Sequence, residues 1–177
     1  MHYMRWVTRS HLHLDRVATP WLIARFVDPE AEFGFLAVGE QPEDGDVPFG
    51  MPGIELSSHD ERGTCFRKVL ERYELADPAL SDMERLIASG VADALGTPPP
   101  AGQTEDEATM GRALNLLGSG MGVALADDEH LRAGMALYEG VYAWCQMHNL
   151  DGSVVAAAPA EHAGRVEYLR QAVGRGR

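Results

Sequence analysis

The sequence predicts an α+β fold, in which a small N-terminal sheet of about three strands is covered by a predominantly helical subdomain. Aromatic and β-branched runs of strand length lie in the first third of the chain, whereas apolar residues recur at helical spacing from Cys65 onward. The chain has 177 residues, 45% hydrophobic and 24% charged, which is enough for one core but not for two sizeable domains. We therefore expect one domain over residues 1–173 and a frayed tail over residues 174–177.

Three segments near the N-terminus are predicted to be strands. Residues 3–8 are aromatic and β-branched, and residues 32–38 alternate and are rich in aromatic side chains. Residues 54–59 are the third candidate, entered through a Pro-Gly pair. Before them, residues 39–53 are dense in Pro, Gly and acidic side chains, which predicts a surface loop of the kind that often borders a pocket.

The first helix is predicted between the first two strands. Asp15 or Thr19 can cap its N-terminus, and Pro20 fits its first turn, where the missing N–H has no partner to lose. The Asp28-Pro29 pair predicts its end, because proline disfavours the helical conformation of the residue before it.

The helical half is predicted from apolar spacing and capping residues. Thr104 and the glutamate three residues later have the spacing of a capping box, and Met110, Leu114 and Leu117 face inward from the helix they open. The glycine-rich residues 118–122 then lie between helices, without the preceding strand that a nucleotide-binding loop requires. The predicted helices begin at Cys65, Pro78, Thr104, Asp127 and Ala156, and the fourth of them extends to His148.

The composition argues against several classes of function. The net charge of −12 and the isoelectric point near 4.9 repel nucleic acid and anionic membranes, so no nucleic-acid partner is expected for this chain by itself. No apolar run approaches the roughly 18 residues of a membrane-spanning helix, and the first residues lack the apolar core of a signal peptide. We therefore expect a cytoplasmic protein that does not engage a membrane, with a homodimer as one possible state.

Three further side chains are assigned structural roles. Cys65 and Cys145 are far apart and lack a CxxC motif, which predicts two free buried thiols in a reducing compartment. His130 lies on a predicted helix without a partner at ligand spacing, and we expect it to be a surface or hydrogen-bonded residue.

Several separated motifs resemble a known family. They are WVTR (6–9), HxDR (13–16), AxPWLIxRF (18–26), DPEAEF (28–33), VPFxMPGxEL (47–56), TCF (64–66) and GMALYEGVYAWC (134–145). Their order resembles the C-terminal domain of the chromate resistance protein ChrB, from about Trp6 to Cys145. The resemblance implies a bacterial domain associated with chromate resistance operons. Longer members carry an additional N-terminal region linked to transcriptional control, and we expect this chain to be a standalone domain without it.

A divalent metal site is the leading functional hypothesis. His13, Glu55 and His59 provide two imidazoles and a carboxylate, a set used by catalytic zinc and by non-haem iron. Glu107, or less favourably Asp93, can complete the site from the helical half. Iron, manganese and zinc all remain open as the metal. On this hypothesis the chain is a small metalloenzyme that acts on a small molecule or on a redox-active or oxyanion species, with no catalytic residue assigned.

The alternative is an oxyanion-binding or sensing module without catalysis. Arg9 and Arg16 flank the histidines and can hold chromate or sulfate, while Asp15 can orient an imidazole. The same residues also have a purely structural interpretation, in which Asp15 caps a helix and Glu55 pairs with Arg16 or Arg62.

Overall fold

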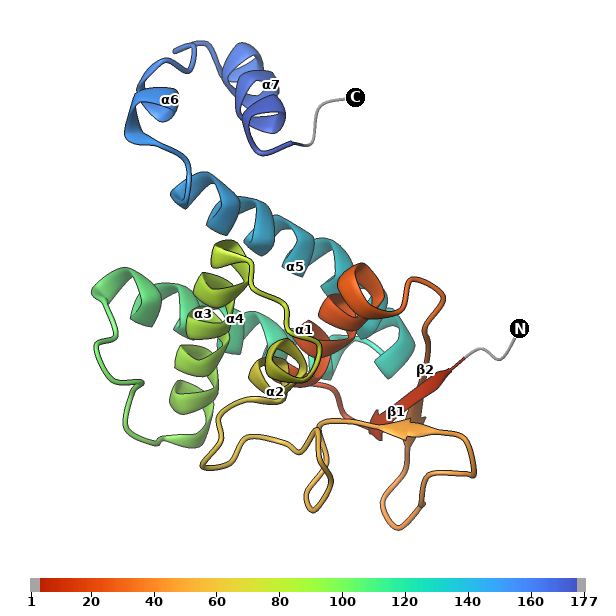
Figure 1. Cartoon of the computed structure of the whole chain (residues 1–177). Coiled ribbons are helices and arrows are strands. Elements are labelled where there is room, and N and C mark those ends of the chain that lie inside the picture. The colour runs from red at the N-terminus through yellow and green to blue at the C-terminus, as the bar shows by residue number, and fades with distance from the viewer. Residues whose placement is uncertain (1–3, 175–177) are drawn as a thin grey trace.

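The computed structural model describes residues 4–174, with a small parallel sheet beside a larger helical half (Figure 1). Strand β1 (Arg5–Arg9) lies between β2 (Glu32–Leu36) and β3 (Val47–Pro48), and both neighbours run parallel to it. Trp6 pairs with Phe33 on one side and with Val47 on the other. The predicted α+β class is therefore confirmed.

The third strand lies elsewhere than predicted. It is formed by Val47–Pro48, inside the segment expected to be a loop, and residues 54–59 form consecutive turns. The carbonyl groups of that segment accept hydrogen bonds from side chains of the following helix, such as the Cys65 thiol on the Leu56 carbonyl. A backbone satisfied in this way has no need of a strand partner.

The first helix also differs from its prediction. Helix α1 (Asp15–Leu22) begins at Asp15 itself, so that Pro20 lies inside the helix and not in its first turn. The carboxylate of Asp15 does not cap this helix, because it accepts hydrogen bonds from another one. The helix continues directly into a π-helical segment, η1 (Ile23–Val27). Helical structure ends before Pro29, as expected.

The helices of the second half begin where capping residues predict. They are α2 (Cys65–Arg72), α3 (Pro78–Leu95), α4 (Glu105–Ala124) and α5 (Asp127–His148). The capping box of Thr104 and Glu107 is present. The glycine-rich segment does not interrupt α4, and Leu117 is 51% exposed instead of facing inward. Gly111 and Gly118 face inward instead. A Cβ at Gly111 would clash with Ser89 of α3, and one at Gly118 would make a tight contact of 3.2 Å with the His13 ring.

The C-terminal segment contains two short helices in place of the single predicted one. Helices α6 (Gly152–Ala156) and α7 (His162–Ala172) are separated around Pro159, and no residue of either is fully buried. Both lie beyond the end of α5 in Figure 1. The expected single domain over 1–173 stays a prediction. Of the expected frayed tail, residues 175–177 lie outside the described residues, as does Tyr3 of the first strand.

One hydrophobic core joins the sheet to the helices. Trp6 and Phe49 from the sheet side belong to the same buried cluster as Phe66, Met83 and Tyr142 from the helices. The sheet and the helices therefore share buried side-chain contacts, and a second, smaller buried cluster consists of Val7, Leu36 and Met51. None of the helices within residues 4–174 combines the length and apolarity needed to cross a bilayer.

Candidate functional site

The loop that leaves β1, residues 10–14, has an unusual backbone. His11 and Leu14 both have positive φ angles, of 62° and 42°, which are costly for residues with a side chain. The carboxylate of Asp127, at the start of α5, accepts hydrogen bonds from the His11 and Leu12 amides at 3.0 and 2.9 Å. The helical half thus holds this loop in a conformation that it would not adopt alone.

Arg16 holds the same loop from the other side. Its guanidinium donates to the carbonyl oxygens of Arg9, Ser10 and His11 at 3.3, 3.4 and 3.0 Å. Burial lowers the pKa of Arg16, while the nearby carboxylate of Asp127 opposes that shift. Three of the five N–H groups of the guanidinium are used in this way, which leaves two without a carbonyl partner among the described residues.

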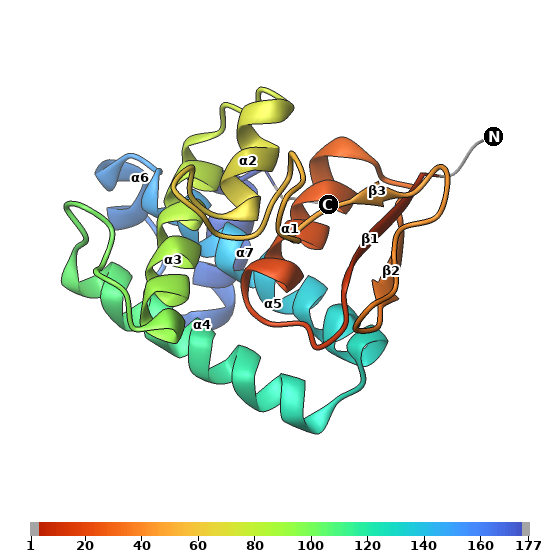
Figure 2. The ribbon, with the colours of Figure 1, turned by 90° about the horizontal axis from the view of Figure 1, so that it is seen from below.

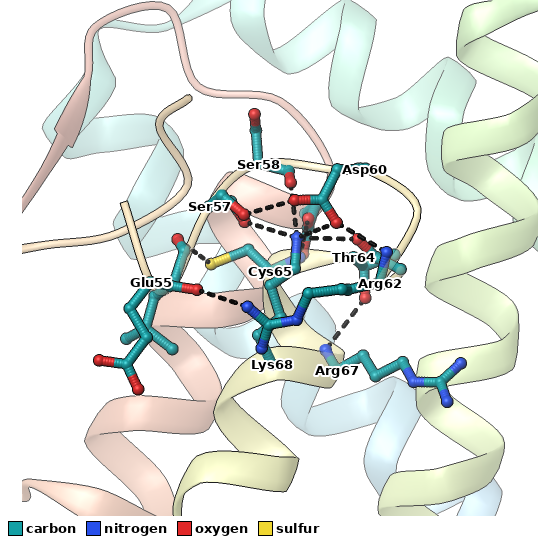
Figure 3. Close-up of polar contacts among 12 residues, drawn as sticks. Glu55, Ser57, Ser58, Asp60, Arg62, Thr64, Cys65, Arg67 and Lys68 are labelled. Atoms are coloured by element: carbon teal, nitrogen blue, oxygen red, sulfur yellow. Dashed lines mark hydrogen bonds and ion pairs between the residues drawn. The ribbon is translucent and has the colours of Figure 1, made fainter. Parts of the chain in front are cut away.

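Lys68 organises a second loop, residues 57–63. It is the only lysine in the chain and is 1% exposed. Its ammonium donates to the carbonyl oxygens of Ser57, Ser58 and Gly63 at 3.3, 2.8 and 3.1 Å, and forms an ion pair at 2.8 Å with Asp60 (Figure 3). The hydrogen bond from Lys68 holds the pKa of Asp60 well below its usual range.

Asp15 connects the first helix to α2. Its carboxylate accepts hydrogen bonds from the Cys65 and Phe66 amides at 2.7 and 3.0 Å and from the Thr19 hydroxyl at 3.1 Å. Burial raises the pKa of Asp15, and the amide hydrogen bonds oppose that shift. The prediction that Asp15 caps the first helix is therefore wrong. Asp15 instead accepts hydrogen bonds from the N-terminal amides of α2, which need an acceptor.

These loops meet at a pocket of about 250 Å³. This is smaller than the roughly 300–1,000 Å³ typical of sites for drug-sized ligands, so it suits an ion or a small metabolite. Its polar lining comes from His13, Asp15, Arg16, Ser58 and His59, and its apolar lining from Leu14, Val91, Ala94 and Leu95. Four residues singled out from the sequence are thus brought together.

His13 is held against α4. Its Nε2 lies 3.3 Å from the Asn115 carbonyl and 3.2 Å from the Ser119 hydroxyl. The side-chain amide of Asn115 donates to Asp93 at 2.7 Å, so Asp93 acts on His13 only through Asn115. The nearest approach of His13 to the helix is at Gly118, where a Cβ would lie 3.2 Å from the ring.

Two predicted metal ligands point to other partners. Glu55 is exposed and forms an ion pair with Arg72, and Glu107 pairs with Arg85 while also capping α4. Within residues 4–174 there is no group of three or more His, Cys, Asp or Glu side chains that could hold a metal ion. The pair His13 and His59 is what remains together of the predicted ligand set. The metal site itself stays a prediction.

Arg9 faces away from this pocket. Its guanidinium donates to the carbonyl oxygens of Ala37 and Glu40, in the loop after β2, at 3.2 and 2.6 Å. Only its backbone carbonyl contributes to the loop of residues 10–14, as an acceptor for Arg16.

Sequence reasoning missed three residues that shape the site. Lys68 and Asp127 were not assigned to it, although a lone lysine between Cys65 and Val69 on the apolar face of a helix was a usable signal. His130, expected to be a surface or hydrogen-bonded residue, is instead 1% exposed, and its Nδ1 has no hydrogen-bond partner among the described residues. Its burial lowers its pKa.

Both cysteines are free and buried, as predicted. Burial raises the pKa of each thiol, that of Cys145 to about 12, so neither is a thiolate near neutral pH. We expect Ellman's reagent at about pH 8 to leave the native protein unmodified and to titrate both thiols after unfolding in guanidinium. Rapid modification of either thiol in the native state would contradict the buried positions.

The fold is an α+β domain in which the loops of residues 10–14 and 57–63, together with α1 and α3, line an open pocket with both polar and apolar residues. The family model described as ChrB, C-terminal domain, matches residues 6–145, and the chain belongs to that family. The chain is also similar to Protein ChrB of Cupriavidus metallidurans, with 37% identity over 95 residues, which is 53% of this chain and 28% of that protein. No solved structure matches the chain.

Proposed function

We propose that the pocket between residues 10–14 and 57–63 binds a small oxyanion, and that this binding is the domain's part in chromate resistance, with which the family is associated. The observation that carries the proposal is the convergence of Arg16, His13 and His59 on one small cavity of an otherwise acidic protein. Guanidinium and imidazole N–H groups are the donors that proteins use for oxyanions.

The negative charge of Asp15 in the same pocket is already balanced. Its oxygens accept three hydrogen bonds, two of them from the N-terminal amides of α2, and Lys68 adds a positive charge nearby. Arg16, by contrast, retains N–H groups after its contacts with backbone carbonyls. His13 Nε2 already contacts the Asn115 carbonyl. The donors proposed for a ligand are therefore the remaining N–H groups of Arg16 and the ring of His59.

The rigidity of the lining also favours recognition of a small ligand. Residues 10–14 are held by Asp127 and Arg16, and residues 57–63 are held by Lys68. A preformed cavity needs little ordering when a ligand binds, so more of the interaction energy contributes to affinity.

His59 provides the cleanest test of the proposal. It is exposed and its ring has no hydrogen bond with another described residue, so the His59→Ala change removes a donor without disturbing the fold. We expect calorimetric titration with chromate and with sulfate to show saturable binding, weakened about tenfold by His59→Ala, since one hydrogen bond to an anion contributes about 1.5–3 kcal/mol. Absence of saturable binding at millimolar concentrations would rule the proposal out.

Two controls make that titration specific. His162→Ala removes an imidazole from α7, outside the pocket, and should leave the affinity unchanged. Treatment with EDTA addresses the metal-centred alternative, which is favoured by the presence of His13 and His59 on one cavity. Binding that survives EDTA supports direct contact with the protein, whereas binding lost with EDTA and restored by zinc, manganese or iron supports the metal.

A further inference from the structure

The outward face of α4 is apolar over its last three turns. Residues 113–124 contain no charged side chain, and Leu116, Leu117 and Val123 are 63%, 51% and 91% exposed. Figure 2 shows α4 along the outside of the molecule, with no other element over its outer side. The exposed apolar and small residues recur three or four positions apart, which places them on one stripe: Ala113, Leu116, Leu117, Gly120, Val123 and Ala124.

The packing of the chain does not account for this stripe. The inner face of α4 already contacts the rest of the molecule through Gly111, Leu114 and Gly118. A Cβ at Gly111 or Gly118 would meet neighbouring atoms, which explains the absence of a side chain there. At Gly120 a Cβ would have no atom within 4 Å, although glycine is less favourable than alanine in a helix.

We propose that α4 pairs antiparallel with α4 of a second copy of this chain, with the two-fold axis passing close to Gly120. An antiparallel register centred there places Leu117 opposite Val123 of the partner subunit and Leu116 opposite Ala124 of the partner subunit, so each leucine meets a shorter apolar side chain. The absence of a side chain at Gly120 lets the two helices approach closely at the axis.

The charges of the helix support a second copy in this orientation. Arg112 is exposed beside the stripe and has no ion-pair partner among residues 4–174. The antiparallel register brings it to the C-terminal end of the partner's helix, which carries partial negative charge. Asp128 of the partner subunit follows there and is exposed, although it also pairs with Arg132 of its own helix. A symmetric dimer makes each such contact twice.

The interface is small, since it rests on one helix from each copy. Specific interfaces of that size lie at the weak end of the known range, and we expect a dissociation constant in the micromolar range. Sedimentation velocity of the full chain, over a concentration series that spans this range, should show a monomer converting to a dimer.

Gly120→Glu tests the register. The new side chain has open space in the monomer, but in the dimer it places two carboxylates against each other at the axis. We expect the dissociation constant to rise at least tenfold, with the circular dichroism spectrum and the thermal unfolding of the monomer retained. Arg112→Glu should weaken the dimer in the same direction because it puts a negative charge at the negative end of the partner's helix.

Gly140→Glu is the matched control. Gly140 is also an exposed helical glycine with no atom within 4 Å of a built Cβ, but it lies on α5, outside the stripe. Its variant adds the same charge and should dimerise like the wild type. A wild type that stays monomeric throughout the series, leaving the stripe to a different partner, overturns the proposal. A dimer that Gly120→Glu weakens no more than Gly140→Glu also overturns it.

Discussion

Replacement of Lys68 with Met is expected to lower the free energy of unfolding by about 3 kcal/mol and the melting temperature by about 6–12 °C. The change keeps the length of the side chain but leaves the carbonyl groups of Ser57, Ser58 and Gly63 without their donor, at roughly 1 kcal/mol each. It also leaves Asp60 without its cation. Urea denaturation monitored by circular dichroism gives the free energy directly.

Arg67→Met is the matched control on the same helix. Arg67 is half exposed and forms an i,i+4 ion pair with Glu71, with Glu84 as a further nearby carboxylate, so its loss should cost less than about 1 kcal/mol. If Lys68→Met costs as little as Arg67→Met, then the buried ammonium does not hold residues 57–63 in place.

The effect of Lys68→Met should also depend on pH. Because Lys68 holds the pKa of Asp60 below the ordinary value of 3.8, the ion pair contributes fully above that pH and is lost as the pH falls through the lowered pKa. The stability curves of wild type and variant should therefore approach each other in acid, while the difference due to the three carbonyl contacts remains. Curves that stay equally far apart at every pH would show that the ion pair with Asp60 contributes nothing to the unfolding free energy. The whole difference would then come from the carbonyl contacts.

The Asp15→Asn change is expected to cost about 2–4 kcal/mol of unfolding free energy. The amide can retain one oxygen for Phe66 and Thr19, but its nitrogen then faces the Cys65 amide and leaves that buried N–H without an acceptor. Burial raises the pKa of Asp15, so removing the charge also relieves a desolvation cost. We expect the lost hydrogen bonding to outweigh that relief. Thr64 accepts the Arg67 amide of α2, but among the described residues no acceptor other than Asp15 binds the Cys65 amide.

Asp44→Asn is the control for this measurement. Asp44 is exposed, in the loop before β3, and its carboxylate accepts no hydrogen bond from the described residues. Its replacement should change the unfolding free energy by less than about 0.5 kcal/mol. A wild-type-like Asp15→Asn variant would mean that the two halves of the site do not depend on this carboxylate for their alignment.

Both changes act on the pocket through its frame. Lys68 holds the loop that carries His59, and Asp15 fixes the end of α2 beside the loop that carries His13. We therefore expect whatever folded fraction remains to bind oxyanions less tightly than the wild type. The size of that loss separates these positioning residues from His59, whose replacement should leave stability unchanged.

The helices were predictable because their signals are local. The capping box at Thr104 and Glu107 and the Pro at position 78 define helix starts through contacts within one turn. The aromatic and β-branched runs likewise predicted β1 and β2. The face that each side chain occupies follows from periodicity, which the sequence displays directly.

The third strand and the first helix were mispredicted because distant partners override local preference. Residues 54–59 have strand-like alternation, but Lys68 and Cys65 satisfy their carbonyl groups. Asp15 is a residue type that often caps the N-terminus of a helix, but the first amide that it binds lies fifty residues further along the chain. In each case a buried polar group took the partner that tertiary packing supplied.

The sequence by itself determined the fold class, the family resemblance and the pairing of His13 with His59 as a candidate site. Only the tertiary structure decided which charged groups join them. Glu55 forms an ion pair with Arg72, and Glu107 forms one with Arg85. Arg16 and Asp15 line the pocket instead. The physical reason is that spacing along the chain fixes which face of a helix or strand a side chain occupies. The partner of a charged side chain depends instead on tertiary packing, which brings a particular opposite charge within a few ångströms.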